Sequence, residues 1–180
     1  PSVVNGLMWR WIYHGRFGAL SGFLYQLGII KSYIPFLTDP NLAMNAVILA
    51  YVWSVCPFSA LLIYAALQVI PREYYEAAKI DGAGVWDRFR YITLPLLRPI
   101  ILIVLVLRTM FAFQHLDIIY TLTGGGPGGA TEVLAWYAYE ESFGYYKFGS
   151  GAAVGIIIAF ITLLISFVYV KILYREIEYA

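Results

Sequence analysis

The polar side chains inside the apolar stretches of this chain are its first candidates for chemistry. Two sets of three, each spaced for one face of a helix, combine aromatic rings with hydroxyl, amide or carboxyl groups: Tyr51, Ser54 and Phe58, and Phe113, Gln114 and Asp117. Rings can pack on the C–H faces of a sugar, while hydroxyl and amide groups give its hydroxyls directional hydrogen bonds. The two sets therefore predict contacts with a sugar-like solute. The alternative, an aromatic stripe that only packs, stays open.

Other kinds of site have little support in the residues. His14 and His115 lie far apart in sequence and Cys56 is the single cysteine, so we expect no metal site and no internal disulfide. The glycine-rich run "TGGGPGGAT", residues 123–131, lacks the G-K-[ST] ending of a phosphate-binding loop, and we expect a flexible turn there. We predict no cofactor, no catalytic residues and no ATP hydrolysis by this chain.

Composition indicates a membrane protein. Of the 180 residues, 61% are hydrophobic and only 13% are charged, whereas soluble domains contain about 25% charged residues. The formal net charge of +1 gives no reason to expect nucleic acid as a partner. A bilayer core needs about 20 mostly apolar residues in a helix. Three stretches meet this need, and we predict membrane-spanning helices over residues 41–70, 99–119 and 149–172.

Basic residues in the short connections predict the orientation of these spans. Arg72, Lys79, Arg88, Arg90 and Arg98 fall within residues 71–98, which we therefore place in the cytoplasm together with the C-terminal tail, 173–180. The opposite, external side then holds an external loop with a short helix, 120–148, and an external segment, 1–40, that includes the end of an upstream helix. The spans before that helix end are missing, so we expect the chain to be a fragment of a larger membrane protein.

Two features within the spans have more than one interpretation. Arg108 is a charge near the middle of the second span, either as a gating or interface group or as an arginine that snorkels to the interface or is paired inside the bundle. We favour the snorkelling or paired arginine, and His115 stays undecided. The pair Gly151 and Gly155 has the spacing of two helices in close approach, rather than that of a nucleotide-binding loop.

The charged stretch between the first two spans predicts a helix–turn–helix. "REYYEAAKI" begins after Pro71 and ends at Asp81-Gly82, with Glu76 and Lys79 spaced to pair. A second helix over residues 85–93 carries an apolar stripe of Trp86, Phe89 and Ile92 and should stop at Pro95, with Pro99 opening the next span.

The residues of this loop, "EAAKIDGA" followed by "WDRFRYITLPLLRP", resemble the cytoplasmic coupling loop of ABC-importer permeases. The stretches "WRWIYHGRFGALSGFL" and "LTGGGP" are similar to its carbohydrate branch, which covers maltose, trehalose and glycerol-3-phosphate. The resemblance implies an all-α, polytopic membrane protein with the type I ABC-importer permease fold: three full transmembrane helices plus the cytoplasmic coupling helix–turn–helix. It also implies that a short set of residues docks onto the ATPase: Glu76, Ala77, Ala78, Asp81, Gly82 and Ala83.

The same resemblance implies the partners and the location in the cell. They are an ABC ATPase dimer, a second homologous permease subunit, an extracytoplasmic solute-binding protein, the sugar and the lipid of the cell inner membrane. Three alternatives stay open. The chain could be a non-transporting scaffold or sensor that binds an ABC ATPase, a permease for a non-sugar solute such as glycerol-3-phosphate, or a standalone carrier, which would not need an ATPase-docking hairpin.

Overall fold

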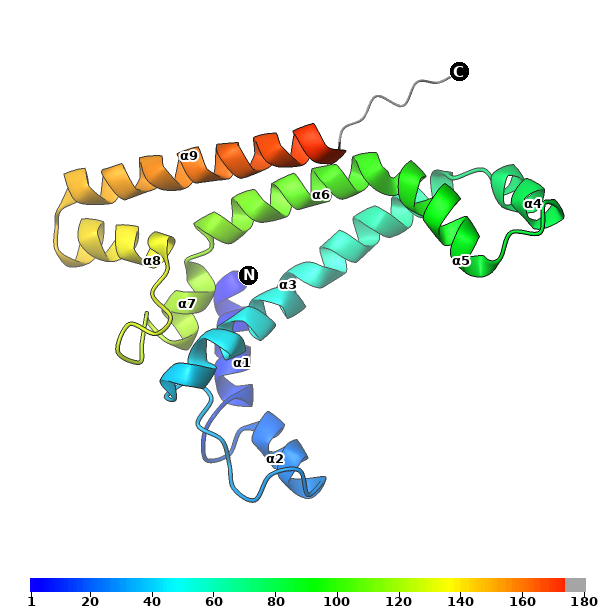
Figure 1. Ribbon diagram of the computed structural model, residues 1–180. Coiled ribbons are helices and arrows are strands. Elements are labelled where there is room, and N and C mark those ends of the chain that lie inside the picture. Colours follow the sequence, from blue (N-terminus) through cyan, green and yellow to red (C-terminus); the bar gives the residue numbers. More distant parts are fainter. Residues whose placement is uncertain (174–180) are drawn as a thin grey trace. The chain divides into compact units, whose positions relative to one another are not determined.

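The computed structural model describes residues 1–173, and every regular element in this range is a helix. In chain order the elements are α1 (Ser2–Ile12), α2 (Ala19–Gln26), α3 (Pro40–Val69), α4 (Arg72–Ile80), α5 (Val85–Arg88), η1 (Phe89–Thr93), α6 (Leu94–Gln114), α7 (Asp117–Leu122), α8 (Leu134–Tyr139), η2 (Glu140–Gly144) and α9 (Phe148–Leu173) (Figure 1). The expected all-α fold is confirmed. Residues 174–180 of the expected cytoplasmic tail lie outside the described range.

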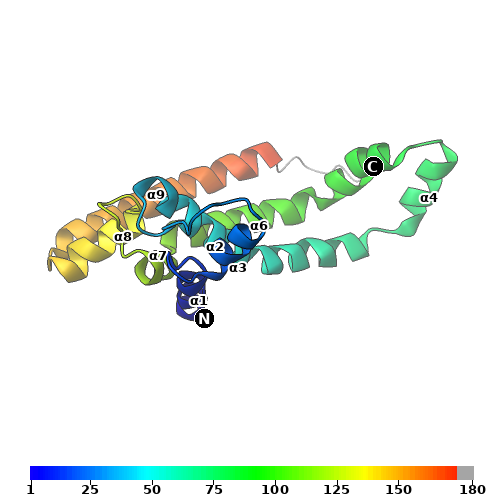
Figure 2. The same ribbon diagram turned by 90° about the horizontal axis from the view of Figure 1, so that it is seen from below.

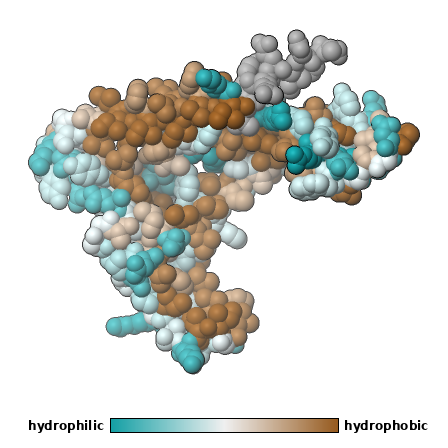
Figure 3. Space-filling view, in the orientation of Figure 1, coloured by the Kyte–Doolittle hydropathy of each residue, from teal (hydrophilic) through white to brown (hydrophobic). Residues whose placement is uncertain are grey.

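Three helical stretches are long and apolar enough to cross a membrane, and they are Pro40–Val69, Val85–Gln114 and Phe148–Ile172. Figure 3 shows hydrophobic residues over much of α9 and hydrophilic ones gathered around α4 and α5. At most 17% of the apolar window of each stretch is buried within the chain, so lipid or other proteins must cover the rest.

The expected helix boundary at Pro95 is wrong. A π-helical turn, η1, carries the chain from α5 into α6, and α6 contains both Pro95 and Pro99. The expected span over residues 99–119 also differs from the elements observed, because α6 ends at Gln114 and the chain starts a new helix at Asp117. His115 and Leu116 lie in the break between the two helices.

The chain divides into two compact units, and α3, α6 and α9 contribute residues to both. The first unit contains residues 1–55 and 113–160. It has a hydrophobic core built from α1, the start of α3 and α7, with these members: Tyr13, Ala46, Val47, Ala50, Ile118, Ile119 and Leu122. Helix α1 packs directly on α7, where the buried Gly6 faces the side chain of Thr121.

The second unit contains residues 56–112 and 161–173 of the described chain. Helices α4 and α5 lie at one end of the hairpin that the second part of α3 forms with α6 (Figure 2). Few of its side chains are buried, and they are Leu97, Val104 and Thr162. This unit therefore presents most of its surface to something outside the chain.

Candidate functional site: the α4–α5 loop and the polar residues of the spans

Helix α4 ends where its sequence predicts. The backbone N–H of Ala83 donates to the carbonyl of Ala78 at 2.8 Å, and the N–H of Gly82 donates to that of Lys79 at 3.1 Å. This pair of bonds is the Schellman arrangement, and it requires a left-handed residue between helix and turn. Gly82 meets the requirement with φ of 81°, and nothing lies within 4 Å of the position that a Cβ would take. Asp81 and Gly82 therefore fix the corner of the loop.

The residues around this corner are open to the surroundings. Glu76, Ala77, Asp81 and Gly82 are exposed, while Ala78 and Ala83 are partly buried. Ile80 at the end of α4 is 88% exposed, which is unusual for an isoleucine next to two charged residues. The expected pairing of Glu76 with Lys79 is wrong: within the described residues these two side chains form no ion pair. Both charged groups are left for solvent or a partner.

A hydrogen bond that the sequence did not indicate ties the two arms of the loop together. The Tyr75 hydroxyl, in α4, lies 2.9 Å from the Thr93 hydroxyl, at the end of η1. Thr93 also donates toward the carbonyl of Arg88 at 3.4 Å. A tyrosine within a charged helix and a threonine before a leucine give no sign of this pairing, which only the folded loop creates. It sets the position of α4 relative to the start of the membrane helix.

The second arm begins at Gly84, whose backbone N–H donates to the Asp87 carboxylate at 3.1 Å. This bond caps α5 at its N-terminus. Trp86 and Phe89, two members of the expected apolar stripe, contact each other with ring centroids 5.5 Å apart. Both rings are largely exposed, so they pack on each other without forming a core.

The solute candidates of the first unit lie around the break between α6 and α7. The ring of Tyr51 contacts the His115 ring at a centroid distance of 4.8 Å. Gln114 and Asp117, on either side of the break, are exposed, and Phe113 is partly buried. The Ser54 hydroxyl donates to the carbonyl of Tyr51 at 2.7 Å, so the helix itself uses this donor. His115, undecided from sequence, thus joins the candidate face.

Phe58, the remaining solute candidate, lies in the second unit against Arg108. The Arg108 guanidinium stands over the Phe58 ring at 5.2 Å, and its Nε donates to the Ser59 hydroxyl at 2.8 Å. The Nη2 atom is buried and has no hydrogen-bond partner among the described residues. Arg108 thus has partners within the chain for its Nε atom and for the face of its guanidinium group, while its role stays a prediction. Whether Phe58 also contacts solute remains a prediction.

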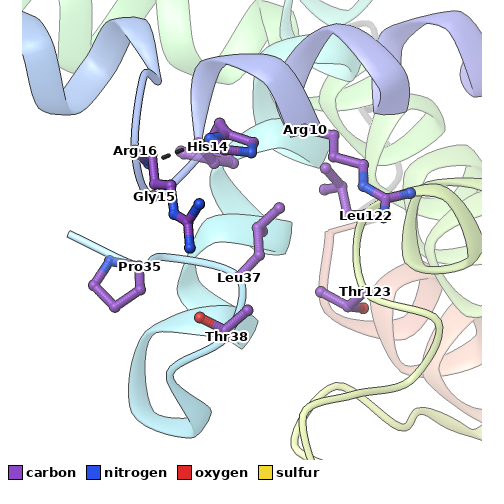
Figure 4. A pocket seen from close by; sticks show the side chains of 10 residues that line it. Arg10, His14, Gly15, Arg16, Pro35, Leu37, Thr38, Leu122 and Thr123 are labelled. Carbon is purple, nitrogen blue, oxygen red and sulfur yellow. Dashed lines mark hydrogen bonds between the residues drawn. The ribbon is translucent and has the colours of Figure 1, made fainter. Parts of the chain in front are cut away.

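A basic pocket opens in the first unit between α1 and the segment before α3 (Figure 4). Its volume is about 620 Å³, and its lining includes Arg10, Arg16 and His14 but no carboxylate. The guanidinium group of Arg10 donates to the carbonyl of Thr121 at 3.5 Å, and this bond holds the group near α7. Tyr13 also lines the pocket, and its buried hydroxyl has no hydrogen-bond partner in residues 1–173. Burial raises the pKa of Tyr13 to about 12, so the hydroxyl keeps its proton.

The glycine-rich loop, expected to be a flexible turn, is fastened by hydroxyl groups. Thr131 is fully buried, and its Oγ1 lies 2.6 Å from that of Thr123 and donates to the carbonyl of Gly126 at 2.8 Å. The Trp136 ring lies against Gly125, where a Cβ would meet it. Gly151 packs closely on Ser142, whereas a Cβ added at Gly155 would meet nothing within 4 Å, so the expected glycine pair makes one close approach inside the chain.

The comparisons with known proteins agree with this architecture. The family model described as "Binding-protein-dependent transport system inner membrane component" matches residues 1–178. This chain belongs to that permease family. Members of the family form the inner-membrane component of the transport system, not the ATPase subunit. The three apolar helices of the present chain fit a multi-pass membrane protein.

Two permease relatives carry sugar names. The trehalose/maltose transport system permease protein MalF of Thermococcus litoralis is 41% identical over 175 residues, which is 96% of this chain and 57% of the relative. The sulfoquinovosyl glycerol transport system permease protein SmoG of Agrobacterium fabrum is 40% identical over 173 residues, or 96% of this chain and 56% of the relative. The chain thus spans about half the length of the curated permeases it matches.

A solved structure supports the permease fold. The crystal structure of a bacterial ABC transporter that imports the acidic polysaccharide alginate matches with a TM-score of 0.83 at 24% identity. The match covers 99% of this chain and 62% of that chain. The expected ABC-importer permease fold is confirmed.

Proposed function

We propose that the whole protein forms half of a translocation pathway for a sugar or sugar-like solute and that a separate ATPase drives it through α4. The observation that carries the proposal is the exposed corner at Gly82, which the Schellman bonds fix in one conformation. A short helix with an exposed apolar end, Ile80, suits recognition in a groove of another protein. A membrane scaffold that does not transport would also bind an ATPase, but it would have no use for the polar face near His115.

Sugar as the solute class is supported by the face around the α6–α7 break. Tyr51 and His115 offer rings, and the exposed Gln114 and Asp117 offer an amide and a carboxylate. Non-helical backbone at membrane depth is tolerated where it lines a cavity or is buried in protein. The names of the two relatives, which include trehalose, maltose and sulfoquinovosyl glycerol, support the same class. Glycerol-3-phosphate stays as the non-sugar alternative.

The proposed partners follow from the proposed orientation. The α4–α5 loop and the C-terminus face the cytoplasm, where an ATPase dimer docks at residues 76–83. A second homologous permease subunit supplies the other half of the pathway. The solute-binding protein approaches from outside, where the pocket with Arg10 and Arg16 offers positive charge to acidic side chains.

The coupling role is tested by charge reversal within α4. Full-length permease carrying Glu76→Lys is purified with its partners from detergent-solubilised membranes, and Glu73→Lys, which reverses another exposed acid of the same helix, is the matched control. We expect Glu76→Lys to lose the ATPase and keep the second permease, while the control keeps both. Transport into proteoliposomes should fall in parallel. Retention of the ATPase and of uptake by Glu76→Lys would rule out this docking site.

The approach of the binding protein is tested at the external pocket. Arg16→Glu should weaken the stimulation of ATP hydrolysis by the binding protein, because it reverses the charge of the pocket. Lys31→Glu reverses an exposed base of the same external segment outside the pocket and should leave the stimulation near wild type. Equal effects of the two variants would show that only the general charge of this segment matters.

A further inference from the structure

A second pocket lies in the other unit, where the membrane helix begins. It is a groove of about 550 Å³ on the α5–η1–α6 stretch, away from the corner at Gly82. Its lining combines three aromatic rings, a leucine and two arginines: Trp86, Phe89, Tyr91, Leu94, Arg90 and Arg98. The proposed coupling residues do not include any member of this set.

The two arginines of the groove are free to bind an anion. Neither Arg90 nor Arg98 forms a hydrogen bond through its side chain or an ion pair within residues 1–173. The nearest acid along the chain, Asp87, accepts a bond from the Gly84 backbone and does not line the groove. By contrast Arg88, which also lies outside the groove, donates to the carbonyl of Gly84 at 3.3 Å. The groove thus has positive charge that nothing in the described chain neutralises.

The position of the groove along the helix identifies the anion. Arg98 is the last charge before the uncharged run of residues 99–107, so it marks the edge of the apolar part of the helix. Arg90 precedes it by eight residues, which is about 12 Å along a helix axis. The headgroup layer on each side of a bilayer is about 5–8 Å thick, so the two guanidiniums reach from the hydrocarbon edge through this layer. Trp86 and Tyr91 are the residue types that gather at this depth.

We infer that this groove binds an anionic phospholipid. The phosphate and any further anionic group of the headgroup contact Arg90 and Arg98, and the start of an acyl chain packs on Leu94 and the Phe89 ring. The π-helical turn of residues 89–93 widens the helix at the groove, and such turns are frequent at functional sites. Placement in the cytoplasmic leaflet rests on the proposed function, but the chemistry requires only an anionic headgroup at the membrane boundary.

The occupant that competes with lipid is an acidic segment of the ATPase. Lipid is favoured because the groove continues through Leu94 into the apolar span. A soluble protein segment does not enter that part of the bilayer. A bound lipid would also hold the second arm of the loop to the membrane. Since the Tyr75–Thr93 bond joins this arm to α4, the lipid would steady the helix on which the ATPase docks.

The test uses the full-length permease with its partners, in nanodiscs of phosphatidylcholine alone or mixed with phosphatidylglycerol. Native mass spectrometry measures which lipid stays bound to the permease after release. Wild type should retain phosphatidylglycerol over phosphatidylcholine, and Arg90→Gln with Arg98→Gln should reduce this preference by roughly 30-fold, which corresponds to about 1 kcal/mol for each arginine near an anionic surface. Arg90→Lys with Arg98→Lys should keep most of the preference, since the charge remains.

A matched control removes two positive charges elsewhere. Arg16→Gln with Lys31→Gln, both exposed in the external segment, should leave lipid preference at the wild-type value. Brominated phosphatidylglycerol then localises the lipid, because it should quench Trp86, and the quenching should fall in a Trp86→Phe variant. An unchanged preference in the Arg90→Gln, Arg98→Gln variant overturns the proposal. Loss of the ATPase from that variant with lipid preference intact assigns the groove to the ATPase instead. Failure of the Glu76→Lys test leaves the lipid result unaffected.

Discussion

The two units of this permease differ in where their side chains find partners. In the first unit, Tyr13, Ala50 and Ile119 are at most 4% exposed, and they pack on one another within the chain. In the second unit, Ile80 and Val85 flank the coupling corner at 88% and 79% exposure. The first unit is held by its own core. The second holds its shape by capping bonds and single polar contacts, and most of its apolar side chains are not covered within the described chain.

The largest expected effect of a single change comes from the core of the first unit. A Cβ on Gly6 would lie 2.8 Å from Thr121 Cβ and still closer to its hydroxyl, so Gly6→Ala forces α1 away from α7. We expect a loss of about 1–3 kcal/mol in stability, the usual cost of overpacking a tight contact. Thermal unfolding of the purified full-length permease complex measures it. Gly155→Ala is the control, because nothing lies within 4 Å of the added atom.

A second change makes this test specific. Thr121→Gly removes all three side-chain atoms that the new Cβ would meet, so it should restore part of the stability lost in Gly6→Ala. In the wild-type background the same change should only destabilise, since it deletes a buried side chain and adds a glycine to α7. If Thr121→Gly were equally harmful in both backgrounds, the close approach of α1 and α7 would not be what limits the first unit.

The second unit should respond to loss of the polar contact at Arg108. Ser59→Ala removes the oxygen that accepts from Arg108 Nε and leaves a partly buried charge with one partner fewer. The expected cost is about 1–3 kcal/mol, as for other unsatisfied buried groups. In an Arg108→Met background the cost of Ser59→Ala should shrink, because no charge is then left unpaired. Thermal unfolding of the four variants gives this coupling, and equal costs in both backgrounds would contradict it.

The contrast between the two units, one held by local bonds and the other by a core of distant residues, explains what the sequence could predict. Helix α4 and its end at Gly82 follow from signals within a few residues, and the structure has them as expected. The break at His115 and Leu116 has no such signal, since no glycine or proline occurs between Phe113 and Asp117. Helix α7 instead packs on α1 through Gly6, more than a hundred residues away. A contact at that separation cannot be read from local pattern.

Local signals also misled in one place. Pro95 and Pro99 are residues that usually end helices, yet the stretch runs on from α5 into α6 through a π-helical turn. The paired side chains Tyr75 and Thr93 were missed for the opposite reason, because neither residue type marks a partner 18 positions away. Around the break between α6 and α7, residue spacing identified Tyr51 and Gln114 as candidates, but the contact of His115 with Tyr51 is visible only in the folded chain.

A smaller effect is expected at the corner of the coupling loop. Gly82→Ala places a Cβ on a residue with φ of 81°, at a cost of about 1 kcal/mol, although no neighbour obstructs it. Asn tolerates this conformation better than other residues with a side chain, so Gly82→Asn should cost less. We expect ATPase affinity, measured with the purified subunits in nanodiscs, to fall in the order wild type, Asn, Ala. Equal affinities for the Asn and Ala variants would mean that the ATPase needs a residue without a side chain at position 82, and not the left-handed turn itself.

The smallest effect should come from the bond that joins the two arms of the loop. Tyr75→Phe deletes a hydroxyl 2.9 Å from Thr93 and should cost about 0.5–1.5 kcal/mol of loop stability, with little change in the fold of either arm. Because this bond joins α4 to the residue before α6, we expect ATP hydrolysis to continue while solute uptake per ATP falls. Tyr74→Phe, which removes the hydroxyl of the exposed neighbouring tyrosine, serves as the control and should keep the wild-type ratio. A ratio unchanged in Tyr75→Phe would mean that the continuous backbone through α5 and η1, and not this side-chain bond, connects the coupling corner to the membrane helix.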